Sequence, residues 1–392
     1  KTLYSVFNIL VDFEMRLLCI LFFCFTIIFA YKTNETAFGI GGYSYFPIIC
    51  IGFGLLRILE VSLKRQELKI RNILPLSLVF IMAIQILVFN VHFTSGVVLS
   101  YVIFFVLCWL LGSEESTWNE IQCVANSYVL SGVIFACLLF SQMRIASNSD
   151  IRFSVFYSDD KFYDLNFLAS SLYCSFSIGM FMISKYHSKV IKCIYMSAIL
   201  FIVAALLLTG SRAAFIAIGI SFVPYINRKQ LVSLIIIGGV LYAVLPYLLP
   251  ELLVQRFMGD SYNDASNEHR LENWKNAILG ISMHPLTGCG LDYSIEALER
   301  VIHKTVNAHN TYLYAIMHFG ILFSILFFVF MLRPIVKIMK FGLSKKLVWI
   351  ILGYLFTTTI IEATLSLTFI TNIAFYYLLS RSDVTATNKL FQ

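Results

Sequence analysis

The stretch TYLYAIMHFGILFSILFFVFML (311–332) contains no Asp, Glu, Lys or Arg across its whole length. A helix rises about 1.5 Å per residue, so a run of this length can cross the ~30 Å hydrocarbon core of a bilayer. The polar residues His309, Asn310 and Thr311 stand at its start. They are compatible with a helix cap, with an anchor at the membrane interface, or with the working end of a site.

The rest of the chain has the same character as this stretch. Hydrophobic residues make up 59% of the 392 residues, charged residues only 13%, and the mean hydropathy is +0.82. Soluble proteins carry about 25% charged residues, so these values predict an all-α polytopic membrane protein. We expect about twelve transmembrane helices, at 13–31, 43–60, 73–91, 96–112, 123–141, 166–184, 190–209, 212–226, 231–249, 309–333, 347–363 and 366–380.

The positive charges predict the orientation. The net charge is +7, and Lys and Arg cluster in short loops at 63–71, 185–192, 227–229 and 333–346. Short basic loops face the cytoplasm in multi-pass proteins, which explains the charge without nucleic acid as a partner. Both termini are then cytoplasmic. The segments 141–167 and 250–308 become outer loops, and the chain 1–392 forms a single membrane domain.

Disulfide and metal chemistry are not expected. Eight of the nine Cys lie in or beside apolar runs, Cys289 alone lies in a long polar loop, and no CxxC or Cys/His ligand spacing occurs. We therefore expect no cofactor.

The loop 250–308 holds the clearest candidate chemistry. Leu271, Trp274, Ile278 and Ile281 recur at helical spacing, which predicts a short amphipathic helix on the outer membrane surface. Pro285 ends this helix because it cannot continue the hydrogen-bond ladder. Arg270 at its start either binds an anion or reaches lipid phosphate as an interfacial arginine.

Two further arginines are predicted on the outer side. Arg212 lies between two apolar runs, where an arginine is costly unless it faces a cavity or a partner. It precedes a helix N-terminus, which favours phosphate or diphosphate, although an interfacial anchor is the alternative. Arg152 precedes the sixth expected span, in a loop whose acidic residues we expect to be solvated.

His309 is the candidate base among several histidines. A neutral imidazole can take a proton from an acceptor hydroxyl, whereas a lone interfacial histidine is more often a polar cap. The rival groups are His269, His284, His303, His318 and Glu362. The topology places Arg212, Arg270 and His309 on the same outer face, where two cations and a base suit transfer from a lipid diphosphate.

Three segments together resemble the bacterial O-antigen polymerase and O-antigen ligase superfamily. They are TGSRAAF (209–215), HRLENWKNAILGISMHPLTGCGL (269–291) and AHNTYLYAIMHFGILFSILFF (308–328), within a similar region of about 195–335. The segment RFSVFYSDDKFYDLNFLAS also resembles the Arg and Asp-x-Asn segment of that family. Many relatives carry an acidic residue before the glycine where this chain has MHFG.

The resemblance implies a fold like that of the GT-C glycosyltransferases and a specific activity. That activity is metal-independent, inverting transfer from an undecaprenyl-diphosphate-linked glycan on the periplasmic face of the bacterial inner membrane. Arg212 and Arg270 would hold the diphosphate, and His309 would act as the base or position the acceptor. We expect the substrate contacts at Arg152, Asn310, Trp274 and His284, and partners such as membrane lipid, a chain-length regulator and a flippase.

Three functions remain distinct at this point. The first is a polymerase of lipid-linked repeat units, favoured by the short 39-residue separation of Arg270 and His309. The second is a ligase that moves finished glycan onto lipid A–core. The third is a flippase, which needs more charge inside its spans than this chain carries.

Overall fold

The computed structural model describes six long segments, 73–93, 118–141, 165–226, 260–290, 308–340 and 345–360, together with short pieces elsewhere. Their helices are α4 (Leu74–Leu87), α6 (Trp118–Ser141), α7 (Leu165–Ile183), α8 (Lys189–Thr209), α9 (Arg212–Phe222), α12 (Asp260–Met283), α14 (Thr311–Lys340) and α15 (Lys345–Thr357). Short 3-10 turns follow α9, at Val223–Tyr225, and α15, at Thr358–Ile360. The helical prediction is confirmed for these segments.

Three short antiparallel strand pairs were not predicted. They are β1 (Gly39–Ile40) with β2 (Tyr43–Ser44), β3 (Arg144–Ile145) with β4 (Phe153–Ser154), and β5 (Phe156–Ser158) with β6 (Lys161–Phe162). Four of these strands lie in the loop expected at 141–167. Each is only two or three residues long, so no alternating pattern was available to indicate it.

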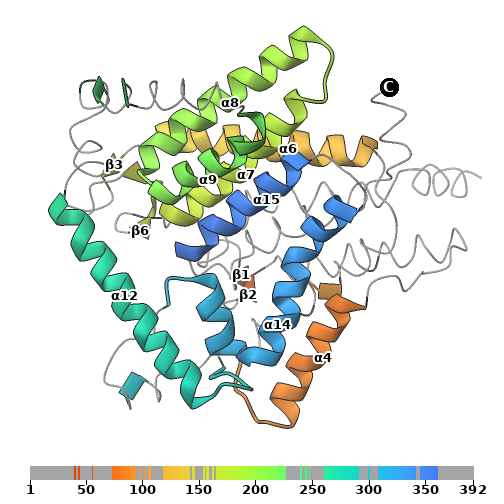
Figure 1. Cartoon of the computed structure of the whole chain (residues 1–392), viewed down its shortest axis with the longest axis vertical. Coiled ribbons are helices and arrows are strands. Elements are labelled where there is room, and N and C mark those ends of the chain that lie inside the picture. The colour runs from red at the N-terminus through yellow and green to blue at the C-terminus, as the bar shows by residue number, and fades with distance from the viewer. Residues whose placement is uncertain are drawn as a thin grey trace, which may run out of the picture.

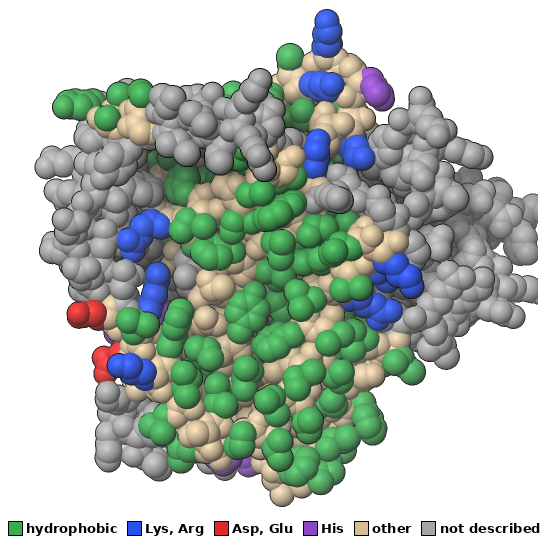
Figure 2. Space-filling view, in the orientation of Figure 1, with side chains coloured by type: hydrophobic (Ala, Val, Ile, Leu, Met, Phe, Trp, Pro, Cys, Tyr) green, Lys and Arg blue, Asp and Glu red, His purple; other side chains and the backbone are tan. Residues whose placement is uncertain are grey.

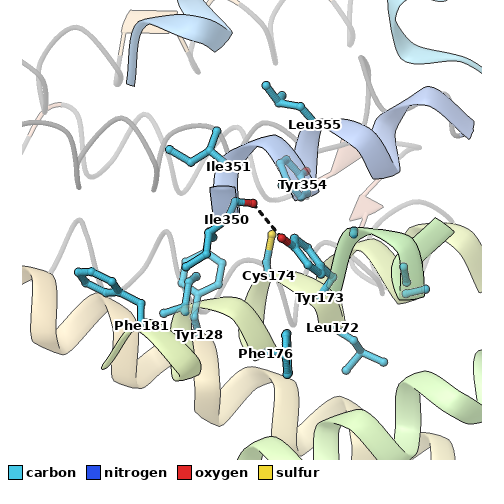
Figure 3. Packing of buried hydrophobic residues seen from close by; sticks show 14 of the residues in the cluster. Tyr128, Leu172, Tyr173, Cys174, Phe176, Phe181, Ile350, Ile351, Tyr354 and Leu355 are labelled. Carbon is cyan, nitrogen blue, oxygen red and sulfur yellow. Dashed lines mark hydrogen bonds between the residues drawn. The ribbon is translucent and has the colours of Figure 1, made fainter. Parts of the chain in front are cut away.

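Helix α7 is the centre of the bundle and packs against α6, α8, α9 and α15 (Figure 1). It buries Tyr173, whose hydroxyl donates a hydrogen bond of 2.9 Å to the carbonyl of Ile350 on α15 (Figure 3). A buried hydroxyl without a partner would cost free energy, so this bond fixes the contact between the two helices. Tyr128, Leu172 and Phe176 surround it.

The second half of α14 carries an aromatic core on one side and an apolar outer surface on the other. Phe319, Phe323, Phe327 and Phe330 are at most 1% exposed. On the opposite side large apolar residues recur at helical spacing and are 46–69% exposed, namely Leu322, Ile325, Val329, Leu332, Val336 and Met339. Figure 2 shows hydrophobic side chains covering the middle of one face, with Lys and Arg near its margins. A surface of this kind is suited to lipid rather than to water.

The number of spans stays a prediction. Among the described residues, α8 and α14 are long and apolar enough to cross a membrane by length and composition. The expected spans 73–91, 123–141, 166–184, 190–209 and 212–226 coincide with α4, α6, α7, α8 and α9 to within a few residues. The prediction of twelve crossings and of a GT-C-like arrangement also involves residues outside the described ones, so it stays a prediction.

The expected uninterrupted span 309–333 is wrong in one respect. Its helix continues through Pro334 to Lys340, but the backbone leaves helical geometry at Gly320, with φ 69° and ψ 173°. Figure 1 shows α14 changing direction there, so that a short first part (311–319) and a longer second part (321–340) meet at a corner. From Ile321 to Lys340 the helix rises about 30 Å, still enough for one crossing.

Helix α12 also differs from its prediction. It begins at Asp260, eleven residues before Leu271, and ends at Met283 just before Pro285, as expected. Its buried residues are the small or amide side chains Asn273, Asn276 and Ala277, whereas Leu271 and Ile278 are more than half exposed. Small side chains allow α12 to approach α14 closely, and the large apolar residues are left facing outward.

Candidate active site

His309 and Asn310 form the turn that leads into α14. The Asn310 side-chain oxygen accepts hydrogen bonds from the backbone N–H groups of Tyr312 at 2.9 Å and Leu313 at 3.1 Å. Asn310 is therefore the N-cap that satisfies two donors at the start of the helix. Its predicted substrate contact stays a prediction, and its oxygen already has a structural role.

His309 adopts a strained backbone conformation beside this cap. Its φ is 42°, in the left-handed region that residues with a Cβ rarely occupy. The preceding Ala308 is fully buried and the following Asn310 is 8% exposed, so both neighbours hold the turn in place. Such a conformation costs free energy and persists only where the surrounding structure enforces it. Residues of this kind cluster at active sites.

The structure brings the middle of α12 to His309. The rings of His269 and His309 have their centroids 6.4 Å apart, and Arg270 is the next residue along α12. Farther along, Ala277 packs with Ala308 and Met317 in a small buried cluster that holds α12 against the first part of α14. Two distant segments thus bring two imidazoles together, and Arg270 follows the first of them in the chain.

Arg212 is the first residue of α9. Gly210 ends α8 in a left-handed conformation with φ 61°, and Ser211 is the extended N-cap of α9. The Ser211 hydroxyl makes a long hydrogen bond of 3.4 Å to the Asn166 side-chain oxygen in the first turn of α7. This contact joins the Ser-Arg segment to the Asp-x-Asn segment, which the family resemblance had grouped only by sequence.

A chain of hydroxyl contacts continues from α7 toward α14. Ser170, one turn beyond Asn166, lies 2.8 Å from the Thr357 hydroxyl at the end of α15. The next residue, Thr358, donates to the Tyr312 hydroxyl at 3.0 Å. The ends of α7, α9, α14 and α15 that carry these contacts are therefore at the same end of the bundle. Arg212 and His309 both lie at that end, as the topology predicted.

The loop 284–290 closes the corner of α14 at Gly320. Backbone N–H groups of Cys289 and Gly290 donate to the carbonyls of Met317 (2.7 Å) and His318 (3.0 Å). The N–H of Ile321 donates to the Pro285 carbonyl at 3.0 Å. These bonds satisfy groups that a broken helix would leave unpaired in an apolar setting.

Two glycines are required for this close approach. Gly320 and Gly288 both have positive φ, of 69° and 74°. A Cβ at Gly320 would overlap the Leu286 carbonyl and lie 2.7 Å from the Gly288 nitrogen. The segments HPLTGCG and MHFG are consequently two halves of one structural unit.

His318 belongs to this unit rather than to the group around His309. It is 3% exposed, and its Nδ1 donates to the Gly290 carbonyl at 2.6 Å, which leaves Nε2 buried without a hydrogen-bond partner. Its ring lies against Tyr314. Of the rival bases that the structure describes, His269, His284 and His318, it places His269 beside His309.

The remaining predicted contacts are placed as follows. Trp274 lies one turn beyond Arg270, and its Nε1 is buried without a partner. His284 is exposed at the other end of α12, about 20 Å from Arg270 along the helix axis. The structure therefore does not bring His284 to the other candidates. Arg152, His303 and Glu362 lie outside the described residues.

Among the described residues, no group of three or more His, Cys, Asp or Glu side chains is arranged to hold a metal ion. Among the described residues, Arg270 follows His269 along α12, and Arg212 lies at the same end of the bundle as His309. These arginines are the groups that could bind an anionic leaving group there.

The sequence analysis did not identify one residue with a clear role, Gln85. It is the amide side chain in the otherwise apolar second half of α4, it is 3% exposed, and it contacts the corner at Gly320. Burying an amide without hydrogen bonds costs free energy, so a lone Gln in an apolar helix indicates that its side chain has partners there. That pattern could have indicated the role of Gln85.

Residues 197–328 match the family model described as O-antigen ligase (Wzy_C). The match begins within α8 and includes Arg212, Arg270, His309 and the corner at Gly320. It confirms the resemblance that the three sequence segments indicated, and it supports a function of the O-antigen ligase or polymerase type. A comparison with curated proteins found no match.

Proposed function

Because residues 197–328 belong to the O-antigen ligase and polymerase superfamily, we propose that this protein is a membrane glycosyltransferase that joins lipid-linked repeat units into a surface polysaccharide. The observation that carries the proposal is the approach of the His269 ring to the strained His309, with Arg270 next to His269 in the chain and Arg212 at the same end of the bundle. The proposed donor is an undecaprenyl-diphosphate-linked glycan, used on the periplasmic face of a bacterial inner membrane.

The residues divide the chemistry between them. An acceptor hydroxyl attacks the anomeric carbon of the donor from the side opposite the diphosphate. The new C–O bond forms as the bond to the diphosphate oxygen breaks, which inverts the anomeric configuration. His309 takes the proton of the attacking hydroxyl, and the guanidinium groups of Arg212 and Arg270 stabilise the charge on the departing diphosphate.

His269 gives the site a second imidazole. Its ring neighbours that of His309, so the two can share a proton or bind adjacent hydroxyls of one sugar. A positive φ at His309 fixes the direction in which its ring leaves the backbone, and the Asn310 cap prevents the turn from relaxing. Such preorganisation favours the transition state over the free substrates.

The outer surface of α12 supports a membrane-bound donor. Leu271, Ile278, Leu279, Met283 and Leu286 are 42–60% exposed and recur along one side of the helix and the turn that follows it. An apolar stripe of this kind is suited to the headgroup boundary of a bilayer. The polyprenyl chain of a donor bound near Arg270 would then lie in lipid beside α12.

The test uses a host strain that lacks the gene and is complemented with single variants. Arg212→Ala, Arg270→Ala and His309→Ala should each abolish chain growth, seen as loss of the polysaccharide ladder on a gel, while the protein remains in the membrane. Arg333→Ala, near the basic end of α14, and His187→Ala, in the turn between α7 and α8, are the matched controls and should leave the ladder intact. A normal ladder from His309→Ala would contradict the proposed base.

A ligase is the second candidate, because the matching family model carries that description. The two activities differ in the product that accumulates when the gene is deleted. Loss of a polymerase leaves lipid A–core bearing a single repeat unit, whereas loss of a ligase leaves core without O-antigen. The short separation of Arg270 and His309 favours the polymerase.

A further inference from the structure

Gln85 connects a helix outside the family match to the corner that supports the candidate site. It lies near the end of α4, and its side-chain Nε2 donates to the Thr287 carbonyl at 3.0 Å and to the Phe319 carbonyl. Thr287 belongs to the loop after α12, and Phe319 ends the first part of α14. One amide group therefore ties three segments together.

The position of Gln85 on α4 shows that this contact is built into the packing. The buried residues of α4 are Pro75, Leu78, Met82 and Gln85, which recur on the side that packs against α14. Beyond α4, the ring of Phe93 stacks on that of Phe319 with centroids 5.2 Å apart. The amide thus sits in an apolar contact, where its Nε2 satisfies two carbonyls that would be costly to leave unpaired, while its own Oε1 is buried without a hydrogen-bond partner.

The corner controls the geometry of the proposed site because it joins the two elements that carry it. Helix α12 brings His269 and Arg270, and the first part of α14 begins at His309. Both elements end at the corner, one at Met283 and the other at Phe319. A change in the angle between them there moves the parts of each that lie away from the corner, including His269 on α12 and His309 before α14.

We propose that Gln85 is a positioning residue of the glycosyl-transfer site, acting through the corner formed by loop 284–290 and Gly320. This inference rests on the proposed function for its catalytic consequence, but its structural part can be tested without activity. The side-chain NH2 group of Gln85 donates to the carbonyl of Thr287 in the loop after α12 and to the carbonyl of Phe319 at the break in α14.

The first experiment measures geometry alone. His269→Cys and His309→Cys are introduced together in the full chain, and a short bifunctional thiol cross-linker is applied to membranes. Each single cysteine variant controls for the native thiols. Adding Gln85→Leu should lower the yield of the cross-link several-fold. Adding Ser77→Ala should not, because Ser77 is the matched polar residue at the other end of α4 and bonds only to its own helix, at Ile73.

The second experiment measures the chemistry with the native histidines present. Gln85→Leu should lower kcat by about 100-fold with a smaller change in the KM for the lipid-linked donor, because misplacement by about 1 Å has that effect on an oriented reaction. Gln85→Asn should recover part of kcat, since it keeps the amide but shortens the reach. Ser77→Ala should match the wild-type protein.

Gln85→Glu gives a pH readout, which is measured together with the amount of folded protein at each pH because ionisation of a buried carboxyl also destabilises the fold. An ionised carboxylate cannot donate to the carbonyls of Thr287 and Phe319, whereas a protonated one can donate to one of them. The activity of this variant relative to wild type should therefore rise as the pH falls from about 9 to about 6, the range in which a buried Glu titrates. A flat ratio contradicts the proposal, and so does an unchanged cross-link in the Gln85→Leu protein.

The outcomes separate the two proposals. If the wild-type protein transfers no glycan but the cross-link still depends on Gln85, the proposed function fails and the positioning of α12 against α14 stands. If transfer occurs and the cross-link, kcat and pH profile are all insensitive to Gln85, the positioning role fails alone. If Gln85→Leu does not accumulate in membranes, the Gln85→Asn and Gln85→Glu variants decide the question.

Discussion

The effect of Gly320→Ala on stability has opposite signs for a broken and for an uninterrupted α14. Gly320→Ala should destabilise the protein if the helix turns a corner there. In an uninterrupted helix the same change should stabilise it by about 1 kcal/mol, because glycine is a poor helix former. The direction of one measured change therefore decides between them.

The expected loss has two parts. Holding a residue with a Cβ at φ 69° and ψ 173° costs about 1–3 kcal/mol. The added Cβ would also overlap the Leu286 carbonyl, and relief of that overlap moves loop 284–290 away. The three backbone hydrogen bonds between this loop and the corner are worth about 1 kcal/mol each. Together these give about 4–6 kcal/mol, a loss of at least several hundred-fold in the ratio of folded to unfolded protein.

The assay is unfolding of the purified protein in detergent, with the amount in the membrane as a second measure. Gly219→Ala is the matched control, since Gly219 lies inside α9 with nothing within 4 Å of its would-be Cβ. That variant should be more stable than wild type by about 0.5–1 kcal/mol. Equal or greater stability of Gly320→Ala would refute the corner and the packing of loop 284–290 against it.

Three further outcomes follow from the same region. Asn310→Ala should lose about 1 kcal/mol of stability through the missing N-cap, whereas Asn310→Asp should keep it, as unfolding in detergent will show. His309→Gly should gain about 1 kcal/mol by relieving the positive φ yet lose glycan transfer, and His309→Ala should lose transfer without that gain. Burial raises the pKa of the Cys289 thiol from 9.0 to about 11. Its alkylation near pH 8 should therefore be much slower in the folded than in the unfolded protein by mass spectrometry, and its stabilising contribution should be lost as the pH rises from 9 to 11.

The sequence predicted the helices well, since long apolar runs have few other structures available in a membrane. The expected limits of α7 and α8 differ from the observed ones by at most one residue at each end. The early start of α12 was not predicted, because residues 260–270 are polar and show no apolar periodicity. A helix in such a segment depends on packing farther along, where Asn273 and Ala277 face α14.

The corner at Gly320 could not be predicted from the apolar run alone. A glycine within a hydrophobic helix is common in membrane proteins and usually marks close helix packing. What makes Gly320 a break is the loop 284–290, which lies about 30 residues earlier and supplies the missing hydrogen bonds. That partnership becomes visible only when the two segments are side by side.

The candidate site was predicted in its members and only partly in its geometry. His269 and His309 come together through α12 and the first part of α14, and Arg270 is the next residue along α12 after His269. His284 does not join them, because His269 lies near the middle of α12 and His284 follows the end of the helix at Met283, about 20 Å farther along its axis. The sequence named both histidines as rivals of His309, and the length of α12 is what distinguishes them.

The corner also explains why the Arg270 segment, loop 284–290 and the His309 segment occur together in this chain. The Arg270 segment and the His309 segment can face each other only if α12 and α14 meet at a fixed angle. Loop 284–290 sets that angle through its bonds to Met317 and His318, and Gln85 secures the loop from a helix that the family match does not reach. A glycosyl-transfer site at His309 would thus depend on an amide outside the recognised region. Transplanting residues 197–328 into a relative without a donor at the position of Gln85 should therefore fail to transfer activity, even with every matched residue present.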